Sequence, residues 1–345
     1  MDDEQGGILG AIGGGLAAII RLLAALYGIL TILFLLARIT VGERLAIVAA
    51  LNNVIPWLAL GAAVLILPAL GSRYRWLLIA LQVPILAAFA VLYGPQFLPR
   101  DVPPAPADGI PVRAATYNIY SPGSDPAEIV EVLAEIDADI AGVQELGPEH
   151  AQAIEQAFAD DYEALVLHPE QPANRGIGLL SRYPVRDEEV FQLTPDSLPA
   201  LRATLDVDGV PVTVLVVHLP AAKYDLLPPQ YDDSARNAAL DALIQDYLEP
   251  ESGPVLLLCD CNTAAYSDKY NELDDRLDDA FAQVGRGLGF SYGFDNAPEP
   301  PAFRIDFVWH SAAFVPQEAR GWSSSGTSDH RPMVADLVLD RRAAP

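Results

Sequence analysis

Three apolar stretches dominate the first hundred residues. They cover about residues 16–37, 45–70 and 76–98, and only short polar breaks separate them. A helix needs roughly 20 consecutive apolar residues to cross the hydrocarbon core of a bilayer, so each stretch is long enough. A buried helical core is the alternative, but three such runs in succession are less typical of one. Residues 1–98 are therefore predicted to form a transmembrane domain of three helices.

The pattern changes beyond this region. Residues 99–111 form a Pro-rich segment, which is predicted to be a fairly stiff linker. Strands and helices then alternate, and this alternation is typical of a layered α/β domain. The expected strands are 112–119, 139–145, 162–167, 176–181, 201–207, 211–218, 254–260, 304–310 and 333–339, and the expected helices are 126–136, 148–158 and 233–249.

The charge is concentrated in this second part. Residues 101–345 hold 42 acidic and 15 basic residues, a formal charge of about −27. Such an acidic surface gains nothing from counterion release on nucleic acid, which weighs against a DNA-binding role without excluding it. Three spans would place the C-terminal domain on the side opposite the N-terminus. The positive-inside rule leaves the orientation open, because it weighs Arg21, Arg73 and Arg75 on one side against Arg38, Arg44 and Arg100 on the other.

Polar side chains end several of the apolar strands. Asn118 ends the first strand, Glu145 the second, and His218 a strongly β-forming run of valines. Asp260 and Asn262 are two residues apart, so they project to the same side. Cys259 and Cys261 flank Asp260 and face the opposite side. Their spacing indicates neither a disulfide framework nor a zinc site, and they leave the compartment open.

Two further features involve histidine. Asp306 lies inside an otherwise apolar strand, and an acid there is costly to bury unless it is paired. A histidine would satisfy it, and Ser328-Asp329-His330 forms a turn just before the last strand.

These polar positions, taken in order, resemble the signature blocks of the endonuclease/exonuclease/phosphatase superfamily of deoxyribonuclease I and the neutral sphingomyelinases. The blocks are Asn118, Gln144-Glu145, His218, Asp260-x-Asn262, Arg304-Ile-Asp306 and Ser328-Asp329-His330. The resemblance covers about residues 112–340, and the predicted catalytic domain is 112–341. Cys259 replaces a usual glycine and Cys261 a common aromatic residue, and neither change removes a functional side chain.

The resemblance implies a four-layer α/β sandwich, two packed sheets flanked by helices, that follows the membrane helices. It also implies a magnesium ion, with manganese as the alternative, bound by oxygen ligands from Glu145, Asn118 and Asp329. His330 would be the general base and Asp306 would orient it, while Asp260 could instead orient or deprotonate the attacking water. The groups implied to bind the substrate phosphate are Asn262, Asn118 and His218, with His218 also a candidate to protonate the leaving group.

The expected function is a magnesium-dependent hydrolase of phosphoester bonds, integral to the cytoplasmic membrane. Three helices followed by this domain look like the bacterial membrane proteins associated with teicoplanin resistance. That likeness implies an external catalytic domain and a lipid-linked phosphate or pyrophosphate substrate. The alternatives are a membrane-tethered nuclease, a sphingomyelinase-like phosphodiesterase and a non-catalytic membrane scaffold. A sphingomyelinase would need apolar loops for lipid entry, and residues 224–231 are either such a loop or, as the composition favours, an ordinary Pro-rich connection. Physiological substrate, oligomeric state and protein partners cannot be inferred from the sequence.

Overall fold

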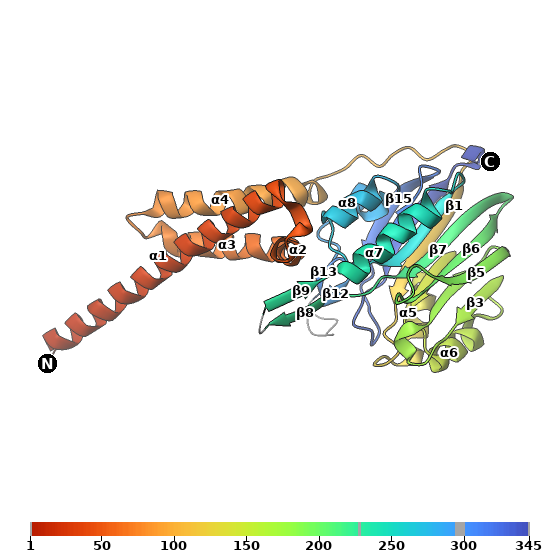
Figure 1. Ribbon diagram of the computed structural model, residues 1–345, viewed down its shortest axis with the longest axis horizontal. Coiled ribbons are helices and arrows are strands. Elements are labelled where there is room, and N and C mark those ends of the chain that lie inside the picture. Colours follow the sequence, from red (N-terminus) through yellow and green to blue (C-terminus); the bar gives the residue numbers. More distant parts are fainter. Residues whose placement is uncertain (1, 227–228, 294–300, 344–345) are drawn as a thin grey trace. The chain divides into compact units, whose positions relative to one another are not determined.

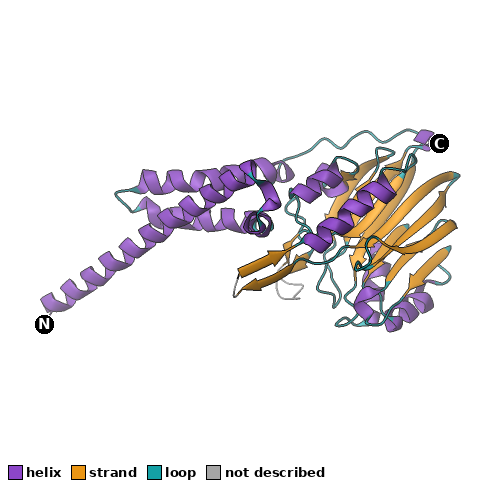
Figure 2. Ribbon diagram, in the orientation of Figure 1, coloured by secondary structure: helices purple, strands orange, loops and turns teal. Residues whose placement is uncertain are grey.

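The computed structural model describes residues 2–226, 229–293 and 301–343. The chain divides into two compact units, the first ending at Pro95 and the second beginning at Gln96. Figure 1 follows the chain through both units, and Figure 2 shows that the first is helical while the second contains the strands.

The first unit is built from apolar helices. They are α1 (Asp2–Thr40), α2 (Ala46–Asn52), α3 (Ile55–Leu70) and α4 (Arg75–Leu92), with short 3-10 turns at Gly42–Arg44 and Gly94–Phe97. Residues 14–40 of α1 and all of α4 are each long and apolar enough to cross a membrane. Helices α2 and α3 together would make a third span, bent by 74° at the break between them.

Two predicted helix boundaries differ from the structure, for local reasons. The helix expected over 45–70 breaks after Asn52, because Pro56 lies in the first turn of α3, where a missing N–H costs nothing. The helix expected to reach residue 98 ends at Leu92. Gly94 and Pro95 follow at once, and the residue before a proline disfavours helical backbone.

Small residues and buried polar groups hold the first unit together. A Cβ added at Gly28 of α1 would lie 2.6 Å from Leu81 Cβ of α4, so the glycine permits close contact of these two helices. The Gln82 side-chain amide donates to the Ala24 carbonyl at 2.9 Å, and the Tyr27 hydroxyl donates to the Leu58 carbonyl at 2.7 Å. These interhelical hydrogen bonds give the side-chain donors of Gln82 and Tyr27 a partner inside an apolar bundle.

The second unit is a sandwich. Within the described residues it contains two six-stranded sheets, with strand orders β15-β16-β1-β2-β4-β3 and β11-β14-β10-β7-β6-β5. The strands of the first sheet are β1 (Ile110–Asn118), β2 (Ile140–Gln144), β3 (Ala164–His168), β4 (Ile177–Ser181), β15 (Phe314–Gly321) and β16 (Met333–Leu339). Those of the second are β5 (Val185–Gln192), β6 (Pro199–Val207), β7 (Val210–His218), β10 (Val255–Asp260), β11 (Asp278–Asp279) and β14 (Asp306–His310).

Three apolar layers separate four layers of structure. Between the sheets lie side chains such as Val112, Val214 and Leu258. The outer face of the first sheet packs against α5 (Pro126–Ile136) and α6 (Pro148–Phe158). The outer face of the second packs against α7 (Ser234–Ala242), the π-helical turn Leu243–Leu248 that continues it, and α8 (Asp268–Asp274). The predicted four-layer sandwich is confirmed (Figure 2). The central strands are apolar on both faces because each face is covered.

Shorter elements complete this unit. They are α9 (Ala280–Val284), the paired strands β8 (Lys223–Leu226) and β9 (Pro229–Asp232), the paired strands β12 (Tyr292–Gly293) and β13 (Pro301–Phe303), and 3-10 turns at Ala173–Arg175 and Arg341–Ala343. The Pro-rich segment is bonded to the sandwich. Arg100 Nη1 donates to the Gln283 carbonyl at 3.0 Å, and Gln317 Nε2 donates to the Pro103 carbonyl at 3.2 Å.

Candidate active site

The predicted site residues lie where central strands of both sheets end. In the second sheet, Asp260 of β10 pairs with His218 of β7 and with Asp306 of β14. Residues in register on neighbouring strands point to the same side of a sheet, so these three side chains form one row. In the first sheet, Asn118 of β1 pairs with Gln144 of β2, and Glu145 follows directly.

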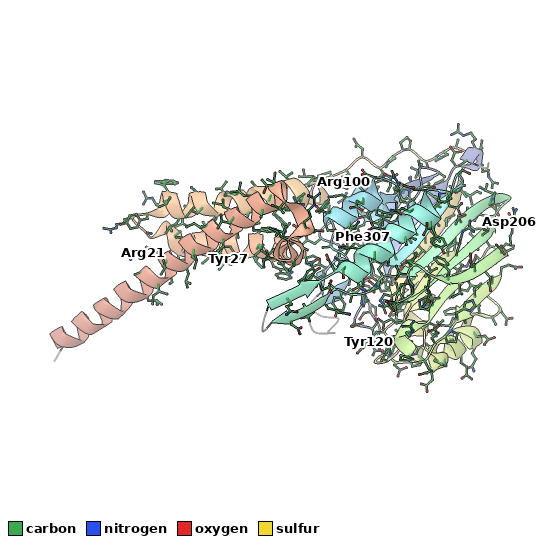
Figure 3. The ribbon with its side chains drawn as sticks, viewed as in Figure 1. Arg21, Tyr27, Arg100, Tyr120, Asp206 and Phe307 are labelled. Atoms are coloured by element: carbon green, nitrogen blue, oxygen red, sulfur yellow. A yellow bond between two sulfur atoms is a disulfide. The ribbon has the colours of Figure 1, made fainter. Side chains whose placement is uncertain are left out.

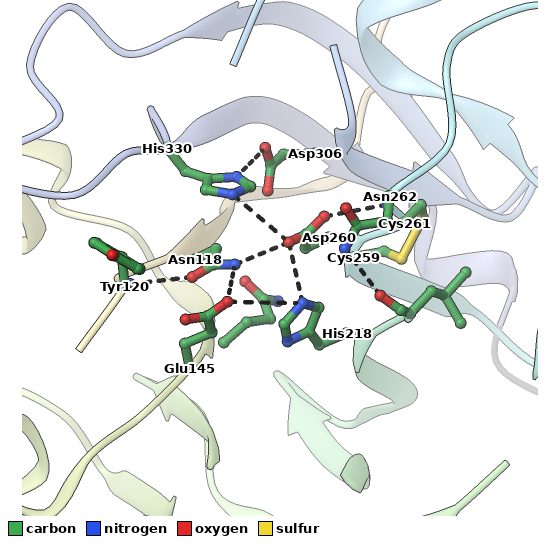
Figure 4. A network of polar contacts seen from close by, with 12 residues as sticks. Asn118, Tyr120, Glu145, His218, Cys259, Asp260, Cys261, Asn262, Asp306 and His330 are labelled. Atoms are coloured by element: carbon green, nitrogen blue, oxygen red, sulfur yellow. Dashed lines mark hydrogen bonds and ion pairs between the residues drawn. A yellow bond between two sulfur atoms is a disulfide. The ribbon is translucent and has the colours of Figure 1, made fainter. Parts of the chain in front are cut away.

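Asn118 joins the two sheets. Its side-chain Nδ2 donates to Asp260 Oδ2 at 2.9 Å and to Glu145 Oε1 at 3.2 Å, and its Oδ1 accepts from the Tyr120 backbone N–H at 3.0 Å (Figure 4). Asn118 and Asp260 are each 1% exposed. One buried amide therefore fixes a carboxylate from each sheet.

The backbone turns sharply at this end of the sandwich. Tyr120, Glu145 and Asn262 have φ angles of 48°, 58° and 46°. Left-handed backbone is uncommon for residues other than glycine, and it persists where the surrounding structure fixes it, often at functional sites. Each of the three lies just after a strand, at the point where the chain leaves the sheet.

His330 forms a buried pair with Asp306. Its Nδ1 is 2.8 Å from Asp306 Oδ2, and the two residues are 5% and 0% exposed. The backbone N–H of His330 donates to Ser328 Oγ at 3.0 Å, and that hydroxyl donates to the Asn118 carbonyl at 2.7 Å. The Ser328-Asp329-His330 turn is thereby attached to the end of β1. The predicted pairing of Asp306 with a histidine is confirmed.

The protonation of these groups reflects burial and crowded negative charge. Burial alone would lower the pKa of His330, but the carboxylates of Asp306 and Asp260 raise it to about 10. Burial, and then the charge of Asp306, raises the pKa of Asp260 to about 7. Burial also raises the pKa of Glu145 and of Asp329. Several carboxyls are thus held in an environment that favours their neutral forms, and a bound cation would relieve this.

The side chains present fit a hard divalent cation. Glu145, Asp260 and Asp329 offer carboxylate oxygens and Asn118 an amide oxygen, the ligands that magnesium and manganese prefer. Among the described residues, Asp306 Oδ1 and Asp329 Oδ1 are buried without a hydrogen-bond partner. A buried Asp260–Asp306–His330 cluster could hold a metal ion, since its ligand atoms lie within 4.8 Å of one another. This cluster differs from the predicted ligands, and His330 Nδ1 is already bonded to Asp306.

His218 and Asn262 border the same cluster. His218 Nε2 lies 3.4 Å from Asp260 Oδ2 and 3.9 Å from Glu145 Oε1. Burial lowers the pKa of His218 to about 4, although the charge of Glu145 opposes this. The Asn262 side-chain amide donates to the Leu219 carbonyl at 2.9 Å, so one of its two N–H groups is engaged within the protein.

Two neighbours were not predicted. The Tyr292 ring lies 4.7 Å from the His330 ring, and Arg236 Nη1 donates to the Asn262 carbonyl at 2.6 Å. Tyr292 belongs to a two-residue strand without periodicity, so no sequence signal marked it. Arg236 stands out in the sequence only as a dispersed positive charge.

The two cysteines correct a sequence interpretation. Cys259 and Cys261 lie on the side opposite Asp260, as alternation predicts, but they form a disulfide with a Cα–Cα distance of 5.2 Å. Both are fully buried among the side chains beneath α7 and α8. Cys261 follows the last residue of β10, and its Cα lies closer to that of Cys259 than the roughly 6.6 Å that separates alternate residues of an extended strand, which brings the two sulfurs together.

Comparisons with known proteins agree with this architecture. The family model described as Endonuclease/Exonuclease/phosphatase family matches residues 115–330. A search of curated proteins found no match. One similar structure is an endonuclease/exonuclease/phosphatase family protein from Bacteroides thetaiotaomicron, with 16% identity, 68% of this chain and 99% of that chain covered, and a TM-score of 0.55.

Two other similar structures have more specific descriptions. A Bacteroides thetaiotaomicron mannosyl-6-phosphatase has 16% identity, 66% of this chain and 100% of that chain covered, and a TM-score of 0.55. The human Nocturnin catalytic domain with bound sulfate anion has 18% identity and a TM-score of 0.52, with 68% of this chain and 97% of that chain covered. At these identities the likeness establishes the fold.

Proposed function

The chain belongs to the endonuclease/exonuclease/phosphatase family, and we propose that it is a metal-dependent phosphoesterase that acts at a membrane surface on a lipid-linked phosphate ester or pyrophosphate. The observation that carries the proposal is the buried His330–Asp306 pair beside the carboxylates of Asp260 and Glu145. This arrangement provides a proton acceptor and an anionic site for a cation at the same place.

A cation bound beside Asp260 and Asp306 would offset the negative charge that raises the pKa of His330 to about 10. In this proposal the neutral His330 then accepts the proton of the attacking water at Nε2. Asp306 holds Nδ1–H at 2.8 Å, which leaves Nε2 as the free basic atom and stabilises the imidazolium that forms. Asp260 Oδ2 lies 3.9 Å from that Nε2, a separation at which it can orient the same water or take its proton. His218 is neutral at pH 7 because burial lowers its pKa to about 4, so it donates a hydrogen bond rather than a charge.

Glu145, Asn118 and Asp329 are the proposed ligands of magnesium or manganese. A divalent cation bound there would polarise a phosphoryl oxygen and offset the charge that develops on it. Asn262 is the proposed amide donor to the substrate phosphate, because Asn118 already donates both of its side-chain N–H groups to Asp260 and Glu145. His218 is the donor closest to the carboxylate cluster.

The helical unit supports a substrate at the membrane. Two helices, or three if the bent pair counts as one span, are apolar enough to anchor the chain in a bilayer. An anchored enzyme encounters substrates at the lipid surface more often than it encounters substrates dissolved in water. The Cys259–Cys261 disulfide supports an external catalytic domain, because disulfides persist outside the reducing cytosol.

Cleavage of DNA is less favoured. A nuclease needs exposed cations near the site, and four arginines of the catalytic domain are instead paired with carboxylates. These four are Arg175, Arg182, Arg236 and Arg304, bonded to Glu170, Asp139, Asp233 and Asp279. Neutralised arginines leave little attraction for a phosphate backbone.

Phosphate release by the purified protein in detergent with magnesium tests the proposal. The first substrate is a polyprenyl pyrophosphate, which releases phosphate directly. The others are sphingomyelin and DNA, whose cleavage products are phosphate monoesters that an added phosphatase converts to phosphate. We expect turnover of the lipid pyrophosphate that is lost with chelator and in His330→Ala, but kept in His168→Ala, where the histidine is 40% exposed outside the site. Cleavage of DNA alone would replace the proposal with the nuclease, and inactivity on every substrate would favour the scaffold.

A further inference from the structure

We infer that the helical unit binds an anionic phospholipid at Arg21, at the end where α3 is joined to α4. The inference rests on the membrane placement in the proposed function, but not on the catalytic site. It starts from a cavity of about 260 Å³ between α1, the end of α3 and the start of α4. Its walls are mainly small apolar side chains, including Ala17 and Ala69, and its polar side chains are Arg21 and Ser72.

Arg21 faces this cavity without a partner from the part of the chain that the structure describes. Among the described residues, its guanidinium forms no hydrogen bond and no ion pair, although it lies on the side of α1 that packs against the other helices. Arg38 is different, since its Nε donates to Asn52 Oδ1 at 2.9 Å. Ionisable side chains in membrane helices usually face the bundle interior or a cavity and pair with a group of opposite charge. A partner for Arg21 is therefore expected from outside the protein.

Counted back from Thr40, where the apolar span of residues 14–40 ends, Arg21 is at the depth expected for lipid headgroups. An α-helix rises 1.5 Å per residue, so the segment from Arg21 to Thr40 is about 30 Å long and matches the hydrocarbon thickness of a bilayer. Ser72 lines the same cavity, and the next aromatic residues, Tyr74 and Trp76, are 48% and 74% exposed. Exposed Tyr and Trp at helix ends mark the membrane–water interface. Figure 3 labels Arg21 on α1.

The charge at this end is positive. The guanidinium carbon of Arg73 lies 4.6 Å from the Tyr74 ring and that of Arg75 lies 5.5 Å from the Trp76 ring. In the described part of the chain, none of Arg21, Arg73 and Arg75 is paired with a carboxylate. Each basic residue near an anionic lipid surface contributes roughly 1 kcal/mol of attraction.

A phosphodiester headgroup with its acyl chain fits these features together. The phosphate would meet the Arg21 guanidinium, and the chain would lie against the apolar wall. Ser72 Oγ accepts the Tyr74 backbone N–H at 3.1 Å, and its own hydroxyl proton has no acceptor among the described residues, so it can donate to a phosphate oxygen. In a three-span topology this end lies in the leaflet opposite the catalytic domain. The site would therefore hold a resident lipid such as phosphatidylglycerol rather than the substrate.

The test uses the full chain in nanodiscs of phosphatidylcholine, with or without phosphatidylglycerol. The readouts are the thermal midpoint and the phosphatidylglycerol that remains bound after extraction, measured by mass spectrometry. We expect phosphatidylglycerol to raise the midpoint of the unsubstituted protein. Arg21→Gln should retain roughly fivefold less of this lipid. Ala17→Leu, which fills the cavity from an exposed position on α1, should also lose the stabilisation.

The matched control is Arg44→Gln, which removes the same charge from an exposed arginine at the other end of the bundle and should behave like the unsubstituted protein. Equal lipid dependence of Arg21→Gln and Arg44→Gln would overturn the inference. So would stabilisation by inorganic phosphate alone, since that would identify a free-anion site. A protein that does not enter nanodiscs would contradict the membrane placement itself. Lipid dependence without phosphoester turnover would leave the lipid site standing while the proposed catalytic function fails.

Discussion

His330 shows how neighbouring charges can outweigh burial at a single residue. A buried histidine ordinarily favours the neutral form, yet Asp306 and Asp260 raise its pKa to about 10. The hydrogen bond from Nδ1 to Asp306 makes Nε2 the nitrogen that can lose its proton. A cation bound beside the two carboxylates would lower the pKa of His330, which a general base at neutral pH requires.

Asp306→Asn tests that assignment. An asparagine can donate an N–H to Nδ1, which would place the ring proton on Nε2, the atom that has to accept one. We expect kcat to fall by about 10²- to 10⁴-fold with little change in KM. The measurement is the kinetics of phosphate release, with Asp206→Asn as the control, because Asp206 lies away from the site, where it pairs with Arg186 and accepts the Gly209 N–H. An unchanged kcat would remove His330 as the base.

The sequence predicted much of this site, but not all of it. Asn118, Glu145, His218 and Asp260 were recognisable because polar side chains end apolar strands. The pairing of Asp306 followed from the cost of burying an acid. Tyr292 was not predictable, because its contact with His330 depends on the tertiary fold rather than on any local pattern. The disulfide was missed for a similar reason, since alternation gave the shared face of the two cysteines but not the bond.

The helices and strands whose bounds were predicted accurately are those with clear capping residues or a clear alternation of apolar and polar positions. Helix α5 has the predicted bounds because Asp125 caps it, accepting the Ala127 N–H, and because Asp137 ends it in left-handed backbone. Strand β5 was missed because five consecutive residues are exposed, which removes the alternation that marks a strand. Strand β15 contains Pro316 and a register shift, and both hide its pattern.

A hydrogen-bonded link between α6 and the loop after β1 supports the site. Ser124 Oγ donates to the Ile119 carbonyl at 2.6 Å, so it accepts from His150 Nε2 at 2.9 Å. The Gly147 backbone N–H donates to Ser121 Oγ at 2.8 Å. These bonds join the segments that follow Asn118 and Glu145, which the metal proposal requires to stay together.

This link predicts a pH dependence of stability. Burial lowers the pKa of His150 below its ordinary value of 6.5. As the pH falls through 6.5, the unfolded chain takes up a proton at this residue and the folded protein does not, so His150 contributes a loss of stability on acidification. Because a glutamine side chain does not titrate, His150→Gln should lose less stability than the unsubstituted protein between about pH 7.5 and about pH 5.5.

The measurement is the thermal midpoint in detergent with chelator at each pH. The carboxyl groups of the site contribute the same pH dependence to the variant and to the unsubstituted protein, so the difference between the two proteins reports on His150. His168→Gln is the control, because His168 is 40% exposed and its Nε2 lies 3.8 Å from Glu188 Oε1, away from this link. Identical pH dependence of the His150 variant and the unsubstituted protein would refute the role of His150.

Across the whole molecule, the amino-acid composition changes from one part of the chain to the next. The apolar runs lie in residues 1–98 and the excess of acids follows them. The side of the membrane was not predictable, because arginines are equally numerous at the two ends of the helices. The disulfide adds an independent argument, since an external domain can keep it oxidised.

Orientation can therefore be tested with single introduced thiols. Both natural cysteines are joined in the disulfide, so a cysteine at the exposed Asp108 would be the accessible thiol. If the catalytic domain is external and three segments cross the membrane, a membrane-impermeant maleimide should label Asp108→Cys in intact cells. It should label Tyr74→Cys, in the α3–α4 connection, only after permeabilisation. The reverse pattern would place the catalytic domain inside the cell, where the disulfide would be reduced and an external lipid-linked substrate would be out of reach. Labelling of both in intact cells would instead mean an even number of spans between them, as expected if α4 does not cross the membrane.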